Sequence, residues 1–214
     1  MSTDSPAALG FRAHSGWAAL VAASGTLDSP VVILRRRVEL ARPGMPGAVQ
    51  PYHAAREMTI EKARAHIERC AEASADLAER AVRQATADLE RAGYRTIGAA
   101  VLLASGRPAG DLAATLASHA AIHTAEGEFF RNALRRGCQS CNLPAEGIRE
   151  RDLTDRSAAA FGISIDEVLE RVALAGKSIG PPWRQDEKLA ALAAWLVLRG
   201  AASAKTGHVP GARG

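Results

Sequence analysis

Helix-forming residues run without a break from Thr59 to Ala92, and no other feature limits the possible folds of this chain as strongly. Thr59 is a favourable N-cap residue, and Gly93 follows where helices commonly end. At 1.5 Å per residue the predicted helix over 59–92 is about 50 Å long, more than a compact domain of this size usually needs. We therefore expect part of it to project, or to form a homodimer by pairing with a second copy of the chain. The stripe that would make this contact consists mostly of small residues: Ile60, Ala63, Ile67, Cys70, Ser74, Leu77 and Ala81.

The residues before this helix are predicted to form a β-hairpin. The segment 9–25 is nearly continuously apolar after Trp17, as in a strand buried on both faces. A turn over 25–30 leads to a second strand over 31–40, which is rich in β-branched residues and leucine. Arginines 35–37 place charge on both faces of this strand, which indicates that it lies at the edge of a sheet.

The rest of the chain alternates between helical and strand patterns. The proline-rich segment 41–58 is predicted to be a loop. Further predicted elements are a buried strand over 95–105, a helix from Asp111 to Arg136 closed by Gly137, a short strand over 146–151, and helices over 154–160, 164–175 and 183–199. Strands separated by helices of this length need crossover connections, so the chain is predicted to be an α/β protein with a mixed sheet. We expect one domain over 9–199 with disordered tails at 1–8 and 200–214.

Composition and charge exclude several classes of protein. The chain has 214 residues and a net charge of +4, and its arginines outnumber its acidic residues before Glu57. This N-terminal part is suited to an anionic partner such as nucleic acid, although a merely solvent-exposed edge of the protein would show the same excess of arginine. The longest apolar run, 189–198, is about half of a membrane span, so we expect no membrane association. Three cysteines and no secretory signal pattern indicate the cytoplasm.

Two short motifs do not have the context that their chemistry needs. Gly176-Lys-Ser-Ile-Gly180 resembles a nucleotide loop and a nucleophile elbow, but a predicted helix leads into it and two prolines follow. Cys138 and Cys141 have redox or zinc spacing but follow the end of a predicted helix, where no dipole would activate a thiolate. We therefore interpret the two cysteines as incidental thiols and assign neither function to the glycine motif.

A histidine pair is the most distinctive chemical feature. His119 and His123 are spaced i, i+4 in the predicted helix over 111–136, on the face that we expect to be buried, and Glu126 lies one turn further on. This arrangement could hold a divalent metal, or a neutral histidine kept in one tautomer by Glu126. A hydrogen-bonded pair of core histidines at an interface is the alternative.

Both ends of the predicted domain resemble a known superfamily. The first strand reads Gly10-Phe-Arg-Ala-His-Ser-Gly-Trp-Ala18, and the final alanine-rich helix opens with Asp186 beside Glu187. These motifs are similar to the ribonuclease-H-like superfamily, in particular its Holliday-junction-resolvase-like branch. The resemblance covers residues 9–199 and implies a mixed sheet that opens with a β-hairpin and is flanked by helices, one of them unusually long.

The sequence departs from this family at the positions of its catalytic carboxylates. The family binds two divalent metals between carboxylates on the first strand, the fourth strand and the last helix. Here the first-strand position is taken by Arg12 or His14, the strand over 95–105 has no acid, and only Asp186 matches. One carboxylate cannot hold two metals on the attacking and leaving oxygens. The resemblance therefore implies the fold more than the nuclease activity.

Three functions remain open. The first is binding of an anionic ligand, such as nucleic acid, without two-metal chemistry, with Arg12, His14, Trp183 and Arg184 as ligand-binding residues. The second is a metal-dependent hydrolase or nuclease with a rebuilt site. The third is a non-catalytic dimeric interaction module. In the second function the catalytic residues would be His119, His123, Glu126 and Asp186, and a divalent metal would be the cofactor.

Overall fold

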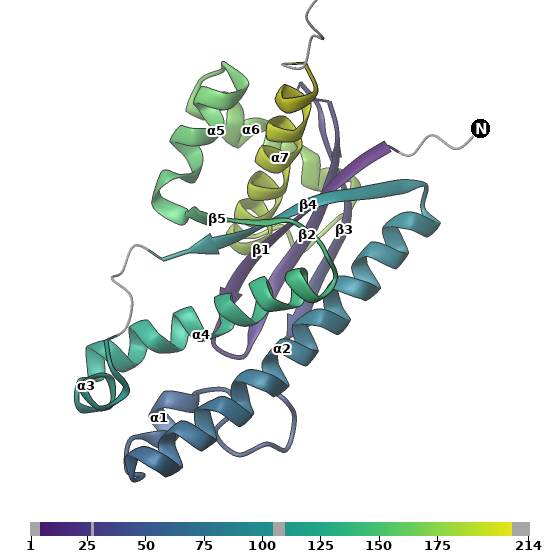
Figure 1. The fold of residues 1–214 in the computed structure, drawn as a ribbon. Helices are drawn as coiled ribbons and strands as arrows, with labels where there is room; N and C mark the ends of the chain where they lie inside the picture. The colour runs from purple at the N-terminus through teal and green to yellow at the C-terminus, as the bar shows by residue number, and fades with distance from the viewer. Residues whose placement is uncertain (1–4, 27, 105–109, 207–214) are drawn as a thin grey trace, which may run out of the picture.

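The fold is built on a five-stranded mixed sheet with the strand order β3-β2-β1-β4-β5 (Figure 1). The computed structural model describes residues 5–26, 28–104 and 110–206, with side chains up to residue 201. The first three strands are antiparallel, whereas β4 and β5 run parallel to β1, so the predicted α/β class with a mixed sheet is confirmed. The strands are β1 (Ser5–His14), β2 (Trp17–Gly25), β3 (Pro30–Glu39), β4 (Tyr94–Leu103) and β5 (Ala145–Arg149).

The predicted single strand over 9–25 is in fact two strands joined by a tight turn. His14 pairs with Trp17, and Gly16 occupies the turn with φ +80, a conformation that favours glycine. Because β1 and β2 are both buried on both faces, their apolar patterns join without a visible change. The predicted hairpin corresponds to β2 and β3, and β3 is an edge strand as expected. Residues 5–8 are not part of a disordered tail as expected, because β1 begins at Ser5.

Helices cover both faces of the sheet and create two cores (Figure 1). Strand residues alternate between these cores: Phe11 and Val101 pack under α2 and α4, whereas Ala8 and Leu102 pack under α5, α6 and α7 with Trp195. The long helices are α2 (Ile60–Arg91), α4 (His119–Ser140) and α7 (Gln185–Thr206), and the shorter ones are α1 (Pro51–Ala55), α3 (Leu112–Ala117), α5 (Leu153–Phe161) and α6 (Ile165–Ala175). Short 3-10 turns span Glu150–Asp152 and Gly176–Ser178.

The long helix predicted over 59–92 is confirmed, and its small-residue stripe packs within the chain. Its N-cap is Thr59, and Gly93 follows it with φ +82. The N-terminal part of α2 extends past the sheet and is covered there by α1 and α3 (Figure 1). Further along, Gly137 of α4 lies so close to α2 that a Cβ on it would be 2.7 Å from the carbonyl carbon of Ala78. Small residues therefore allow α2 and α4 to approach each other's backbone closely.

The predicted helix over 111–136 is divided in two at Ser118. Asp111 caps α3 by accepting a hydrogen bond from the Ala114 N–H (2.9 Å), and Ser118 caps α4 by accepting one from the Ala121 N–H (3.3 Å). The break changes which face of the helix is buried. As a result His119 and His123 are exposed, contrary to the prediction.

Other boundaries also differ from the prediction. The segment 41–58 contains the short helix α1. α4 continues past Gly137 to Ser140, because this glycine serves the contact with α2 rather than a helix end. α7 continues to Thr206, so residues 200–206 are not a disordered tail, while residues 1–4, 105 and 207–214 lie outside the described part.

The three cysteines are unpaired, and two of them lie in the core. Cys138 is buried in the core beside α2, and burial raises the pKa of its thiol to about 12. Cys70, Cys138 and Cys141 are all free thiols. Within the described residues, every helix is too short or too polar to cross a membrane.

Gly10 provides a test of how closely α7 packs on the sheet. A Cβ at this position of β1 would lie 1.8 Å from the carbonyl oxygen of Ala190 in α7. We expect Gly10→Ala to lower the free energy of unfolding by about 3 kcal/mol, because a helix backbone must move to admit the methyl group. Urea denaturation measures this difference. As a control, Gly200→Ala places a methyl group in open space on an exposed helical position and should stabilise by less than about 1 kcal/mol. Equal effects of the two substitutions would contradict the close contact.

Candidate functional site

Four polar side chains meet at the edge of the sheet where the parallel strands end. We call Arg12, His14, Glu150 and Asp186 the Arg12 group. Arg12 and His14 end β1, Glu150 follows β5 directly, and Asp186 lies in the first turn of α7. Arg12 follows Ala8 and Gly10 on the face of β1 that α7 covers, so its side chain reaches Asp186. The carboxyl ends of parallel strands are a common place for binding sites in α/β proteins.

Arg12 binds both carboxylates of the group. Its Nε and Nη2 donate to the two carboxylate oxygens of Glu150 at 2.9 and 2.8 Å, and its Nη1 donates to Asp186 Oδ1. The hydrogen bond to Glu150 is the main cause of the raised pKa of Arg12. Partial burial raises the pKa of Asp186, but hydrogen bonds from Arg12 and His14 outweigh this effect and lower it overall. Asp186 is therefore ionised at neutral pH.

His14 is fixed in place by two contacts. Its Nε2 lies 3.0 Å from Asp186 Oδ1, and its ring stacks on Trp17 at 4.3 Å with an interplanar angle of 12°. The guanidinium of Arg37 lies 3.9 Å from the centre of the same Trp17 ring and forms an ion pair with Glu39. The turn between β1 and β2 thus holds the imidazole beside Asp186.

The Arg12 group does not fit the two metal ions that the resembled family uses. Its donor set contains only two carboxylates, and the guanidinium of Arg12 already donates to both. A metal ion between Glu150 and Asp186 would have to displace this cation and its hydrogen bonds. The chain thus provides its own positive charge at this place.

Sequence reasoning missed Glu150. It placed this residue inside a short predicted strand over 146–151, whereas β5 ends at Arg149 and the side chain of Glu150 turns toward Arg12. One signal could have identified Glu150. It is an acidic residue just past a strand, and if that strand runs parallel to the first one, its end lies on the same side of the sheet as Arg12.

Three histidines of α1 and α4 form a second group with a buried glutamate. We call His53, His119, His123 and Glu126 the His53 group. His119 Nε2 and His123 Nε2 lie 3.0 Å apart, and the rings of both pack edge-on against His53 of α1. The buried Glu126 accepts hydrogen bonds from the backbone N–H groups of Tyr52 (2.8 Å) and His53 (3.0 Å). His53 was missed because the segment 41–58 was predicted to be a loop.

Trp183 and Arg184, which sequence reasoning assigned to ligand binding, have structural contacts. The Trp183 indole packs on Gly176, where a Cβ would be 2.3 Å from the ring, and its Nε1 donates to the carbonyl of Val172. The Arg184 N–H donates to Glu187 Oε2 at 2.9 Å, as in a capping box, and the side chain of Arg184 is exposed. The structure therefore divides the predicted site residues between two groups and leaves these two outside both.

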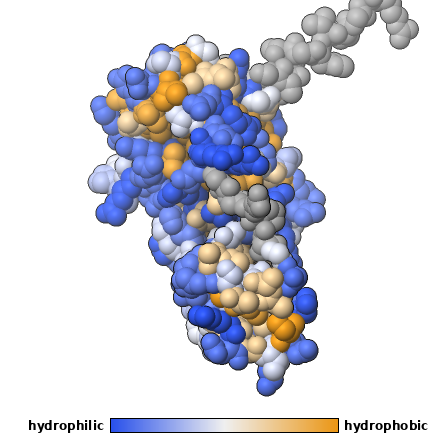
Figure 2. All heavy atoms as spheres, turned by 90° about the vertical axis from the view of Figure 1, so that its left-hand side faces the viewer, coloured by the Kyte–Doolittle hydropathy of each residue, from blue (hydrophilic) through white to orange (hydrophobic). Residues whose placement is uncertain are grey.

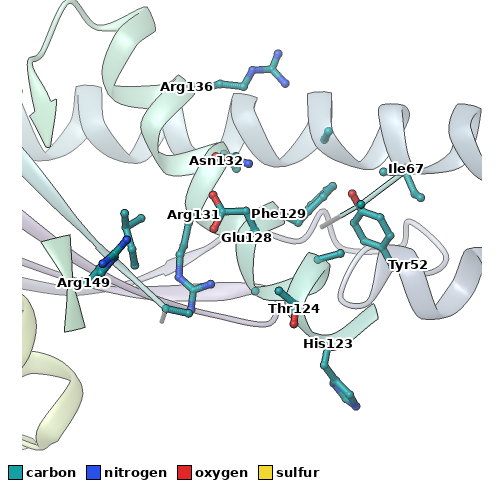
Figure 3. A pocket seen from close by; sticks show the side chains of 17 residues that line it. Tyr52, Ile67, His123, Thr124, Glu128, Phe129, Arg131, Asn132, Arg136 and Arg149 are labelled. Carbon is teal, nitrogen blue, oxygen red and sulfur yellow. The ribbon is translucent and has the colours of Figure 1, made fainter. Parts of the chain in front are cut away.

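An open cavity of about 890 Å³ lies between α4 and the ends of β4 and β5. Figure 3 shows Arg131, Arg136 and Arg149 at one side of this cavity and Tyr52 and His123 at the other. Among the described residues no ion pair involves Arg136 or Arg149, and both are exposed. Figure 2 views the molecule from the left of Figure 1 and shows apolar residues at the bottom, over the α3 end, and at the upper left, with hydrophilic residues over much of the remaining surface. The three arginines of the cavity are named the cavity arginines below.

Arg131 connects the cavity to the Arg12 group. Its Nε donates to the carbonyl of Leu102 at 3.1 Å, and desolvation by burial lowers its pKa. The charges of Glu128, Glu150 and Arg12 also act on the Arg131 guanidinium, so the charges of the cavity and of the Arg12 group are near each other. The edge of the sheet and the cavity therefore form one region that is rich in arginine.

The fold is ribonuclease-H-like, of the Holliday-junction-resolvase-like kind, as shown by the strand order, the parallel β4 and β5, and the helix that closes the fold over β1. The resemblance seen in the sequence is therefore confirmed at the level of the fold. Two solved structures share it: Thermus thermophilus RuvC, at 13% identity with a TM-score of 0.52, and T. thermophilus RuvC in complex with Holliday junction substrate, at 14% identity with a TM-score of 0.50. Each similarity covers 92% of this chain, and 96% and 95% of the respective RuvC chains. No protein-family model and no curated protein sequence matches the chain.

The ion pairs of the Arg12 group should make a pH-dependent contribution to stability. We expect Arg12→Met to lower the free energy of unfolding by about 1–2 kcal/mol at pH 7, because Glu150 and Asp186 lose their shared cation while remaining partly buried. The native pKa of Asp186 lies below its unfolded value, so the stabilisation is present above the unfolded pKa and is lost as pH falls through the folded one. Urea denaturation at pH 7 and below about pH 4 should show the difference shrinking.

A matched control tests whether this effect belongs to the Arg12 group. Arg83→Met removes an exposed arginine that pairs with Glu79 on α2, and it should change stability little at either pH. A loss for Arg12→Met that stays constant between the two pH values would contradict the role of the Asp186 carboxylate.

Proposed function

We propose that this chain binds an anionic ligand, specifically nucleic acid, at the arginine-rich edge of its sheet, and that it does so without two-metal nuclease chemistry. The observation that carries the proposal is the presence of arginine at the sheet edge where the resembled family keeps carboxylates. Arg12 offsets one of the two negative charges of Glu150 and Asp186, and the cavity arginines add positive charge next to them.

The charge balance of the Arg12 group argues against two-metal catalysis. Two metal ions need several carboxylates to hold them on either side of a phosphate. Here one cation already bonds both of the acids that face it, and β4 has no acidic residue. The role of Arg12 in this proposal is to hold the sheet edge together and to reduce the negative charge that would repel a phosphate backbone.

The cavity arginines are suited to phosphate contacts. Arg136 and Arg149 are exposed, and Arg131 is held toward the cavity by its bond to Leu102. Guanidinium groups bind phosphate oxygens through paired N–H donors, independently of base sequence. One of the solved structures similar to this chain is RuvC in complex with a Holliday junction substrate, so a protein of this fold binds nucleic acid.

The two other functions predicted from the sequence have less support. A hydrolase that uses His119, His123, Glu126 and Asp186 needs Asp186 beside the histidines, but Asp186 binds Arg12 and His14. For a dimeric module, the small-residue stripe of α2 would have to be available, but its residues Ala63, Cys70 and Ser74 are buried within the chain. The cytoplasmic location stays part of our proposal, and three free thiols are consistent with a reducing compartment.

Nucleic-acid binding should depend on the cavity arginines. We expect Arg136→Ala and Arg149→Ala each to weaken binding of duplex and four-way-junction DNA by about fivefold to tenfold at 0.1 M salt, and to reduce the slope of log affinity against log salt by about 1. Each substitution removes one phosphate contact. Fluorescence anisotropy of labelled DNA at several salt concentrations measures both quantities.

The control removes an arginine at the opposite end of the sheet from the cavity. Arg95 is exposed at the beginning of β4, whereas the cavity lies at the end of this strand, so Arg95→Ala should leave affinity and slope unchanged. If the native chain does not bind DNA at low salt, where phosphate contacts are strongest, the proposal is wrong.

Metal binding at the Arg12 group should require removal of the arginine. We expect about 10 mM Mg²⁺ to leave the Tm of the native chain unchanged and to raise that of Arg12→Asp by about 2–4 °C, because three carboxylates would then face one another. Mg²⁺ is the suitable probe because it prefers oxygen ligands to the imidazoles of the His53 group. Mg²⁺-dependent DNA cleavage by the native chain, or an equal rise in its Tm, would contradict our assignment of Arg12.

A further inference from the structure

We propose that His53, His119 and His123 together bind one divalent transition-metal ion, with Zn²⁺ as the best match, and that Glu126 positions His53 for this role. The site is separate from the Arg12 group and contains none of the cavity arginines, although His123 also lines the cavity. It would connect α1 to the beginning of α4.

The three imidazoles already lie close enough to share a metal ion. One ring nitrogen of each lies within 4.8 Å of those of the other two, and the Nε2 atoms of His119 and His123 are 3.0 Å apart. Ligand nitrogens at about 2.0–2.1 Å from a tetrahedral Zn²⁺ lie about 3.3 Å from one another. Small rotations of the side chains would therefore complete the site.

The local fold explains why these residues meet. Ser118 starts α4, and the i, i+4 spacing places His119 and His123 on the same side of its first two turns. Both side chains are exposed, so their positions do not follow from burial in the core. α1 packs beside α4 and contributes the third ring, whose centre lies 5.6 and 4.9 Å from those of His119 and His123.

Glu126 gives a second, independent indication of a missing positive charge. Its side chain is only 4% exposed, and its Oε1 lies 3.3 Å from His53 Nδ1 in addition to accepting two backbone N–H groups. Its Oε2 is buried and has no hydrogen-bond partner among the described residues. A buried carboxylate is costly without a compensating charge, and a nearby dication would supply one.

The contact between Glu126 and His53 also selects the nitrogen that faces the metal. A carboxylate at Nδ1 holds the proton there and leaves the lone pair of Nε2 free to bind an ion. Metal-binding histidines commonly have such a carboxylate partner. Glu126 is thus a positioning residue, and His53, His119 and His123 are the ligands.

The ligand set indicates the kind of ion. Three neutral imidazoles suit Zn²⁺, Co²⁺, Ni²⁺ or Cu²⁺ and not Mg²⁺ or Ca²⁺. A tetrahedral ion would keep its fourth position for water or an anion, on the exposed side of His119 and His123. The competing interpretation is a hydrogen bond between His119 and His123 with no metal.

Direct metal titration tests the proposal. The full chain without a histidine tag is stripped with a chelator and titrated with ZnCl₂ by calorimetry, and with CoCl₂ by visible absorption. We expect one ion per chain and a tetrahedral Co²⁺ spectrum. His119→Ala and His123→Ala are at exposed positions and should keep the fold, yet each should weaken binding by at least about 100-fold. Glu126→Gln should weaken it by about 10–100-fold while the Co²⁺ spectrum keeps its shape, because the ligands are unchanged.

The control is His14→Gln, which removes an imidazole from the Arg12 group and should leave Zn²⁺ affinity unchanged. Circular dichroism verifies that each variant is folded. A native chain that binds no Zn²⁺, or that binds it equally well after His119→Ala and His123→Ala, would overturn the proposal in favour of a hydrogen-bonded histidine pair. Because DNA binding is measured separately on Arg136 and Arg149, either proposal can fail without the other.

Discussion

The close contact between α7 and β1 is the interaction on which both the fold and the Arg12 group depend. Gly10 has no side chain to separate the strand from Ala190, so the helix lies directly on the sheet and its first turn reaches the end of β1. This contact brings Asp186 to Arg12 although 174 positions separate them in the sequence. A chain with few large side chains can form a well-packed core in this way, through backbone approach rather than through bulky residues. The same principle joins α2 to α4 at Gly137.

Much of the fold could be predicted because local patterns were strong. The unbroken run from Thr59 to Ala92 indicated α2, and the alternation of strands and helices indicated the α/β class. The boundary between β1 and β2 could not be predicted from apolar pattern, since both strands are buried on both faces. The break at Ser118 was missed for another reason. The alanine-rich sequence on both sides of Ser118 favours helix, so the role of this serine as a cap was not visible.

The candidate site was harder to predict because its geometry depends on tertiary structure. The sequence identified Arg12, His14 and Asp186, but their partner Glu150 depends on where β5 ends. Likewise, His119 and His123 were visible as an i, i+4 pair, while His53 reaches them only because α1 folds against α4. Pairing between distant segments is set by the sheet and the helix packing, and no spacing in the sequence encodes it.

The part of α2 that extends past the sheet has a consequence for the dynamics of the molecule. Around it, α1 and α3 share a small apolar cluster in which the buried residues are Ala55, Ala63 and Leu116, and the partly buried Tyr52 and Ile67 join it to the core under α2 and α4. So small an apolar cluster stabilises this end of the molecule much less than the two larger cores stabilise the central sheet. This end of the molecule should therefore open as a local unit while the sheet stays folded, and its amide hydrogens should exchange with solvent well before those of β1 and β4.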